Sequence, residues 1–525
     1  MTGTASLLLF LLRRERRSLP WWLLGVTLLV LVQSAQSQSL YGTPEALQRL
    51  RQTIGANNAV IAMSGPTDLL ASIGGEVVFE IFAFAAIVVA LMSMFLVGRH
   101  TRADEEAGRA ELVRSARVGR HAPLAAALLL AGLADAAAGV LVVAVAVGTG
   151  LPVAGSVLFG AAITAVGVVF AASAAVAAQV FESVRAVYGT VAALLGAAFA
   201  VRAAGDVGDG ALSWASPIGW GQRTLPYAGD RWWPVLLSLA VAGLLGVAAV
   251  ALSARRDFGA GLVATRPGRA HASPLLRDTS ALAWRLQRGA VAGWAAGLFL
   301  LGVAYGSIGD SIEQYVRDNP EVAQFLTGGA GDVLNAYLAV TAGMAALLVA
   351  AYGVTSVLRA RSEETSGRAE VVLAGPTSRG SWLAGQLSVS LAGTALALAA
   401  FGLGEGLSYG LTVSDLGQVP RLTGVALTYL PAVWLVAGVT VLAFGWLPRP
   451  AAIIAWVMVA YCAVITLFAD SFDLPAWSRQ ASPLAHVPQA PRDDVTVTPL
   501  LVLAVIAAAL VAAGYAGLRR RDVGY

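Results

Sequence analysis

The sequence predicts an all-α integral membrane protein with about twelve transmembrane helices, arranged as two six-helix halves related by a pseudo-twofold axis. Of its 525 residues, 57% are hydrophobic and only 13% are charged, whereas a soluble protein carries about 25% charged residues. The apolar residues form runs long enough to cross a bilayer and cover every face of each helix, which excludes soluble amphipathic helices. A duplicated charged segment, described below, divides the chain into its halves.

Each apolar run of about 20 residues is interpreted as one membrane-spanning helix. The first run follows Arg13, Arg14, Arg16 and Arg17 and lacks a small-residue cleavage site, so we interpret it as a retained span rather than a signal peptide. The predicted spans of the first half are 19–37, 77–98, 122–148, 153–180, 186–203 and 233–252. Those of the second half are 289–309, 334–358, 383–410, 422–444, 450–469 and 498–517.

The distribution of arginine predicts the orientation, because short cytoplasmic loops are enriched in basic residues. Arginine gathers near the start, in the 99–120 loop, in the 253–288 linker, in the 359–379 loop and at 519–521. The alternate loops carry acidic residues, among them Asp310, Glu313, Asp318, Asp493 and Asp494. We therefore expect a multi-pass protein of the plasma membrane with both termini in the cytoplasm.

Composition excludes several classes of function. The single cysteine, Cys462, allows no intrachain disulfide and no cysteine-based metal site. The four histidines are scattered without ligand-like spacing, so we expect no metal site and no catalytic residues. A net charge of +4 could suggest nucleic acid, but the arginines lie in short clusters between apolar runs. The sequence predicts a transporter rather than an enzyme.

An internal duplication is visible in the cytoplasmic loops. The segment RADEEAGRAELV, Arg102 to Val113, matches RSEETSGRAEVV, Arg361 to Val372, at a displacement of 259 residues. A second match pairs SARRDFG at 253–259 with LRRRDVG at 518–524. We therefore predict a six-span permease half at 1–260, a cytoplasmic linker and entry segment at 261–288, and a second permease half at 289–525. Halves that enter the membrane in the same direction predict a transport pathway between them.

The duplicated loop is the sharpest functional signal in the chain. Its arginine and glutamate side chains offer orientable contacts to the surface of another protein. The alternative is a solvated interfacial turn with intrahelical ion pairs such as Glu105 with Arg109. We favour docking of a partner, because a turn alone does not require two copies of one sequence.

With E-x-x-G-R after the second span of each six-span unit, the chain resembles type-2 ABC export permeases. The doubled, Arg-only and Ala-rich form is similar to actinobacterial exporters of polyketide antibiotics or multiple drugs. In that family this loop forms the helix that couples to the ATPase, and a second contact lies between spans four and five. The resemblance implies coupling roles for Glu105, Gly108, Arg109, Glu111, Glu182, Arg185, Glu364, Gly367, Arg368 and Glu370. In the second half, the counterpart of the second contact is a short Leu447–Arg449 turn without an acid.

The resemblance also implies a separate ATPase, in two copies, that binds ATP and Mg²⁺. A P-loop needs a lysine, and this chain has none, so no cofactor is expected on the chain itself. The predicted function is ATP-driven export of hydrophobic or amphipathic, antibiotic- or drug-like compounds. The rival is a proton-driven secondary efflux transporter, which requires titratable groups within the membrane. Asp135, inside the third span, is a weak candidate for the substrate path, with a hydrogen-bonded interior position as the favoured alternative.

Overall fold

The computed structural model is helical, as composition and periodicity predict, and describes residues 2–54, 58–263, 270–273, 276, 278–318, 330–468 and 475–522. Contacts divide the chain into two compact units, Met1–Gly268 and Arg269–Tyr525. Within the described residues, eleven helices are long and apolar enough to cross a membrane, and Ala451–Leu467 is a shorter apolar helix. The predicted all-α membrane fold is therefore confirmed, and the helix found at the span predicted for 450–469 is shorter than the eleven others.

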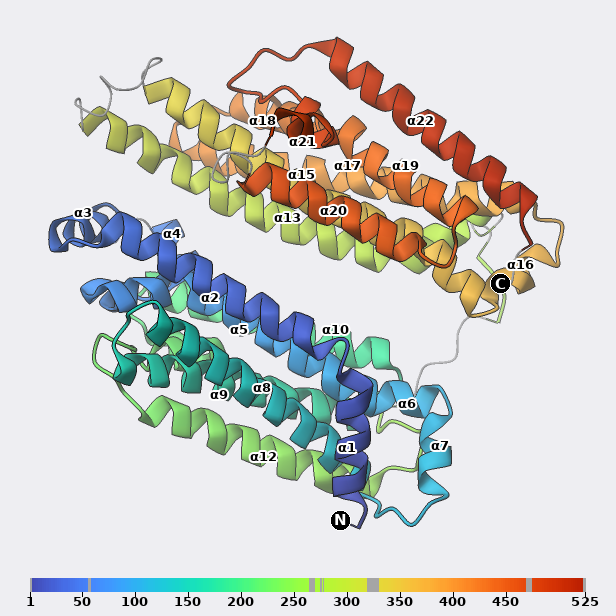
Figure 1. The fold of residues 1–525 in the computed structure, drawn as a ribbon, viewed down its shortest axis with the longest axis horizontal. Coiled ribbons are helices and arrows are strands. Elements are labelled where there is room, and N and C mark those ends of the chain that lie inside the picture. Colours follow the sequence, from blue (N-terminus) through green and yellow to red (C-terminus); the bar gives the residue numbers. More distant parts are fainter. Residues whose placement is uncertain are drawn as a thin grey trace. The chain divides into compact units, whose positions relative to one another are not determined.

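In the first unit, α5 and α9 form the centre and the other long helices surround them (Figure 1). In the most apolar stretch of each span, the buried share is 72% for the span that contains α5 and 67% for α9. It is only 17% for α2 and 22% for α12. The peripheral helices therefore leave apolar side chains for lipid to cover. The helices are α1 (Thr4–Glu15), α2 (Leu19–Tyr41), α3 (Pro44–Ile54), α4 (Asn58–Ser64), η1 (Thr67–Ala71), α5 (Ile73–His100), α6 (Arg102–Glu106), α7 (Arg109–Arg114), α8 (Ala122–Gly148), α9 (Val153–Val180), α10 (Val184–Val207), η2 (Leu212–Ala215), α11 (Pro217–Gln222) and α12 (Trp233–Arg255).

The second unit repeats the pairing of helices seen in the first. In unit one α5 packs on α2, α8, α9 and α10, and in unit two α15 packs on α13, α17, α19 and α20. The last helix of each unit packs on the fourth span, α12 on α9 and α22 on α19. The helices are α13 (Thr279–Asp318), α15 (Ala330–Thr365), α16 (Arg368–Leu373), α17 (Arg379–Thr412), α18 (Gln418–Leu427), α19 (Leu430–Trp446), α20 (Ala451–Phe468), α21 (Ala476–Gln480), η3 (Pro483–His486) and α22 (Val497–Arg520).

Small residues let these helices approach closely. At the crossing of α8 and α9, a Cβ added to Gly139 would lie 2.6 Å from the Gly160 carbonyl oxygen. At the crossing of α19 and α22, a Cβ on Gly445 would lie 2.0 Å from the Gly514 carbonyl oxygen. Both crossings bring backbones together, which is how helices pack where lipid weakens the hydrophobic drive.

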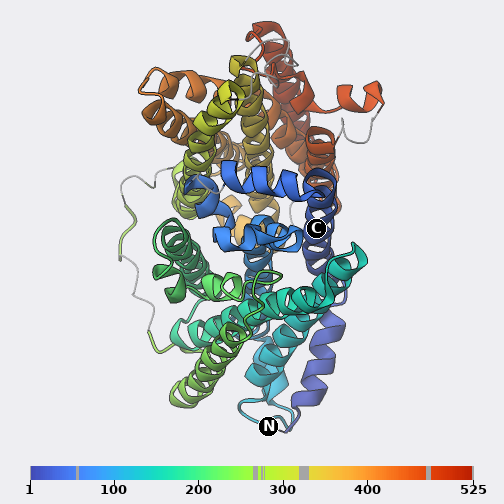
Figure 2. The same cartoon turned by 90° about the vertical axis from the view of Figure 1, so that its left-hand side faces the viewer.

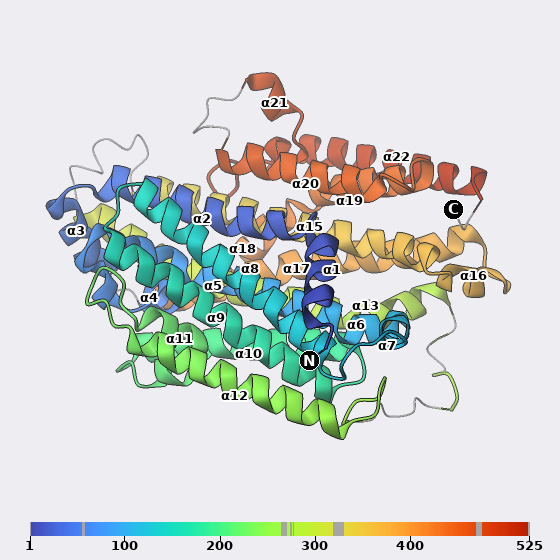
Figure 3. The ribbon, with the colours of Figure 1, turned by 60° about the horizontal axis from the view of Figure 1, so that its bottom comes forward.

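The structure adds one break within a predicted span and one helix before the first span. The span predicted at 422–444 is broken into α18 and α19, because Pro431 in the first turn of α19 has no N–H for a continuous helix and its ring clashes with the preceding turn. At the N-terminus, the basic segment forms a separate helix, α1, which runs at a steep angle to the bundle (Figures 1 and 3). The sequence analysis predicted neither the break between α18 and α19 nor the helix α1.

The two ends of the first unit differ in character. The chain start, α6 and α7 lie at one end, while α3 and α4 lie at the other, the end that faces the viewer in Figure 2. The segment PEALQRLRQTI forms α3.

Candidate functional site

The duplicated loop adopts the same backbone path in both units. In the first unit a short helix ends at Glu106, Gly108 turns the chain at φ 70°, and α7 begins at Arg109. In the second, α15 ends at Thr365, Gly367 turns the chain at φ 73°, and α16 begins at Arg368. Glycine is favoured at both positions because it adopts positive φ without strain. Lack of space is not the reason, since a Cβ at either position would meet nothing within 4 Å.

Replacing Gly108 or Gly367 is therefore expected to test conformation without a steric clash. We expect Gly108→Ala to cost about 1 kcal/mol, because alanine disfavours positive φ, and Gly108→Asn to cost less, because asparagine tolerates this region. The order of thermal midpoints in detergent checks this. Equal thermal midpoints for wild type, Gly108→Ala and Gly108→Asn would contradict this conformational explanation.

The first glutamate of each motif points into the protein and holds the exit of the last span. Glu105 accepts two hydrogen bonds from Arg256, at 2.6 and 3.0 Å. Glu364 makes the equivalent bidentate contact with Arg521, with one bond of 2.7 Å and a shorter one. Their side chains are 12% and 3% exposed. The alternative ion pair of Glu105 with Arg109 was wrong, since Arg109 instead contacts Asp104 at 2.7 Å.

Two further arginines tie each loop to backbone carbonyls. Arg102 donates to the carbonyl of Ala178, two residues before α9 ends, and Arg361 donates to Pro448, two residues after α19 ends. Arg120 and Arg379 bind carbonyls at the ends of α12 and α22 respectively. The loop, the end of the fourth span and the exit of the sixth are thus joined in each unit. In the sequence, these arginines could have been found because Arg361 and Arg379 lie 259 residues after Arg102 and Arg120, the same displacement as in the duplicated loop.

The remaining motif residues lie on the exposed side of α7 and α16. Arg109 and Glu111, and equally Arg368 and Glu370, are exposed. Beside them each helix presents a bare apolar side chain, Leu112 at 77% exposure and Val371 at 79%. These two residues are equivalent in the duplication, and the sequence interpretation, which followed charge, missed them. An exposed leucine and an exposed valine at matched positions, each beside exposed charges, make this surface a candidate contact for a partner.

The second predicted contact lies beside the first loop. Arg185 is exposed on the first turn of α10, and Glu182 precedes that helix. The carboxylate of Glu106 accepts a hydrogen bond of 2.5 Å from the Val184 backbone N–H. The first loop therefore binds the start of α10 directly. In the second unit the Leu447–Arg449 turn is held instead by Arg361, which also donates to the Arg449 carbonyl.

An ionic cluster connects α1 to the loop in the first unit. Glu15, 1% exposed, accepts hydrogen bonds from Arg99 at 2.9 Å and contacts His100 Nε2 at 2.8 Å. Arg14 contacts Asp104 at 2.8 Å. Burial opposes ionisation of Glu15, but hydrogen bonds from His100, Ser18 and Arg99 outweigh it and lower its pKa to about 2. The cluster was missed because its members lie 84 to 90 residues apart.

The low pKa of Glu15 predicts an acid-sensitive attachment of α1. A carboxyl group whose folded pKa lies below its unfolded value of 4.5 stabilises the fold above that pH and loses this contribution as pH falls toward 2. We expect Glu15→Gln to lower the thermal midpoint at pH 7, with the difference from wild type shrinking between pH 5 and 3. A difference that stays constant over this range would contradict the assignment.

The weak candidate Asp135 lies in the interior of the first unit. Its side chain is fully buried on α8, accepts a 2.6 Å hydrogen bond from Ser93 on α5, and packs against Gly167 on α9. This geometry is that of an interior polar contact, and a role in the substrate path stays a prediction. Among the described residues no group of His, Cys, Asp or Glu is arranged to hold a metal ion.

Comparison with known proteins extends over nearly the whole chain. The chain is 43% identical over 528 residues to the multidrug efflux system permease protein Rv1217c of Mycobacterium tuberculosis (strain ATCC 25618 / H37Rv), covering 99% of this chain and 95% of the relative. The chain belongs to this permease family. Residues 276–519 of the permease also match the family model described as multidrug efflux system permease Rv1217c, C-terminal domain. The predicted efflux permease is confirmed, and the predicted coupling roles of individual residues stay predictions.

Proposed function

We propose that the chain is the membrane subunit of an ABC exporter for hydrophobic or amphipathic drug-like compounds, driven by a separate ATPase. The observation that carries the proposal is the pair of equivalent loops, each with an exposed apolar residue flanked by exposed charges. Such a surface fits a protein partner, because a protein interface pairs an apolar centre with charged groups around it. The relative's name, an efflux system permease, supports this assignment.

The contacts within each unit indicate how motion of a docked loop reaches the membrane. Because Glu105 holds Arg256 and Arg102 holds the carbonyl of Ala178, a displacement of α7 acts on α12 and α9 together. The second unit has the equivalent contacts through Glu364 and Arg361. We propose that two ATPase copies, binding ATP and Mg²⁺, move α7 and α16, and that the halves tilt in response.

The same proposal places the loops and both termini in the cytoplasm. It rests on the arginines around α1, α6, α7 and the end of α12, which follow the positive-inside tendency. In a Cys462→Ser background, a cysteine at Glu111 should react with an impermeant maleimide only after the cells are opened. A cysteine at Leu416, beyond the opposite end of α17, should react in intact cells. The reversed pattern would overturn the orientation.

Energy coupling is tested by transport into inverted membrane vesicles that contain the permease and its ATPase. We expect drug accumulation that requires ATP, is blocked by vanadate and persists when an ionophore removes the proton gradient. Accumulation that survives vanadate but stops with the ionophore would overturn the proposal in favour of a proton-driven transporter.

A further inference from the structure

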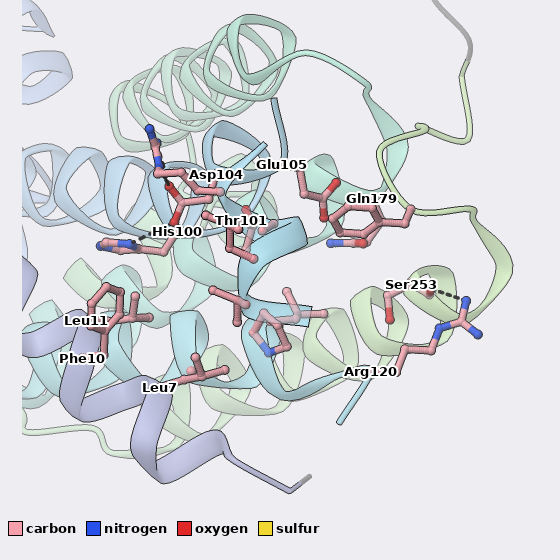
Figure 4. A pocket seen from close by; sticks show the side chains of 18 of the residues that line it. Leu7, Phe10, Leu11, His100, Thr101, Asp104, Glu105, Arg120, Gln179 and Ser253 are labelled. Carbon is pink, nitrogen blue, oxygen red and sulfur yellow. Dashed lines mark hydrogen bonds and ion pairs between the residues drawn. The ribbon is translucent and has the colours of Figure 1, made fainter. Parts of the chain in front are cut away.

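A cavity of about 570 Å³ lies in the first unit between α1, the duplicated loop, α8 and α12. Apolar side chains of α1, Leu7, Phe10 and Leu11, lie on one side of it, and Arg120 and Ser253 lie on the opposite side (Figure 4). Arg14 and Arg109 also line it. The cavity therefore combines an apolar wall with cationic groups, the two surfaces that an anionic amphiphile requires.

The charged side chains that line the cavity leave one cation in excess: Arg14, Arg109, Arg120 and Arg256 face Asp104, Glu105 and Asp257. Asp104 is shared by two arginines, Arg14 at 2.8 Å and Arg109 at 2.7 Å. Glu105 is likewise shared by Arg102 at 2.9 Å and Arg256 at 2.6 Å. Within the described part of the chain, Arg120 donates to the carbonyls of Ser253, Ala254 and Arg256 and forms no ion pair. An anion near Arg14, Arg109 and Arg120 would balance this charge.

A second, apolar groove of about 720 Å³ lies between the same two helices, α8 and α12. On α12 the cavity is lined by Ser253 and Arg256, and the groove by Val247 and Val250 in the turns before them. On α8 the groove is lined by Leu128 and Leu129. Leu129 is 50% exposed and Val247 70%, so this face is open to the bilayer. Apart from Thr4 of α1, the residues that line the groove have no polar side chains, so the groove suits an acyl chain.

From these two features we infer that the first unit binds an anionic phospholipid. Its phosphate lies near Arg14, Arg109 and Arg120, and an acyl chain follows the groove between α8 and α12. Basic pockets between membrane helices bind anionic headgroups in this manner. The headgroup contacts α1 and α7 together, so the lipid holds the loop against the bundle. A free anion would leave the groove unused, and a zwitterionic lipid would leave the excess charge unbalanced.

The test uses the purified full chain, delipidated in detergent and without any ATPase, so it is independent of the proposed function. Phosphatidylglycerol should raise the thermal midpoint by about 3 °C or more at saturation, whereas phosphatidylcholine and inorganic phosphate should not. The Arg14→Gln, Arg120→Gln double variant should lose most of this shift. The matched control, Arg16→Gln with Arg117→Gln, removes two exposed arginines that do not line the cavity and should keep it.

A second variant separates lipid binding from the ion pair that Arg14 makes. Ala110→Trp fills the cavity from α7 without changing any charge, and it should also abolish the shift. Native mass spectrometry of the wild-type chain should show retained phosphatidylglycerol in preference to phosphatidylcholine. An equal shift with phosphatidylcholine, a full shift with inorganic phosphate, no lipid preference in the wild type, or an unchanged shift in both variants would overturn the inference.

Discussion

Replacing Glu364 with Gln is expected to destabilise the second unit and to uncouple ATP hydrolysis from transport. Glu364 is 3% exposed and holds Arg521 in a bidentate ion pair. Removing one partner of a buried pair leaves an unpaired charge and costs about 3–5 kcal/mol. The same change frees the loop from the exit of α22, so its motion no longer reaches that helix. The thermal midpoint and drug-stimulated ATPase activity measure the two effects.

A charge exchange separates this ion pair from contact with a partner. Glu364→Arg combined with Arg521→Glu keeps an opposite-charge pair, so we expect it to recover a large part of both stability and coupling. The second unit suits this exchange, because Arg361 binds carbonyls of the Leu447–Arg449 turn rather than Glu364. If the double variant is no better than Glu364→Gln, or if Glu364→Gln leaves stability unchanged, the proposed internal tie is wrong.

Placing aspartate at both exposed apolar positions is expected to abolish ATPase binding while leaving the fold intact. Leu112 and Val371 are 77% and 79% exposed, so their replacement removes little internal packing. If each is covered by the ATPase, a buried aspartate costs several kcal/mol per site unless it is paired. We expect Leu112→Asp with Val371→Asp to lose copurification with the ATPase and vanadate-sensitive transport.

The matched control for this variant keeps the apolar surface. Leu112→Met with Val371→Ile should retain ATPase binding and transport, because both substitutions preserve hydrophobic contact. The thermal midpoints of both double variants should stay close to that of the wild type. Normal transport by the aspartate variant, or a large loss of its stability, would contradict a docking role for this surface.

The membrane fold could be predicted because lipid imposes a simple requirement on sequence. Every span must be apolar over about 20 residues, and the predicted runs correspond to eleven long helices and one shorter one among the described residues. Breaks within an apolar run were harder to predict. Pro431 divides α18 from α19 within a run that is apolar enough to be interpreted as one span. The basic segment before the first span was not predicted to form a helix of its own, because it mixes apolar residues with arginines.

The candidate site was located by the sequence, but the partners of its residues were not. The duplication identified both loops and the importance of Glu105 and Glu364, yet their ion pairs join residues 151 and 157 positions apart. Such long-range pairing depends on how the helices pack against one another, and this packing cannot be predicted from the pattern of a single sequence. The exposed Leu112 and Val371 were missed because an apolar residue beside a membrane span gives no signal until its exposure is known.

The central claim, that both loops dock onto an ATPase, is tested most directly by site-specific photocrosslinking in the membrane. A benzophenone amino acid at position 112 or 371 should crosslink to a protein whose peptides contain the Walker motifs of an ABC ATPase. The same probe at Leu416, beyond the opposite end of α17, should not. Crosslinks at both loop positions are the predicted result. If neither position reaches such a protein while the permease still transports, the account is contradicted.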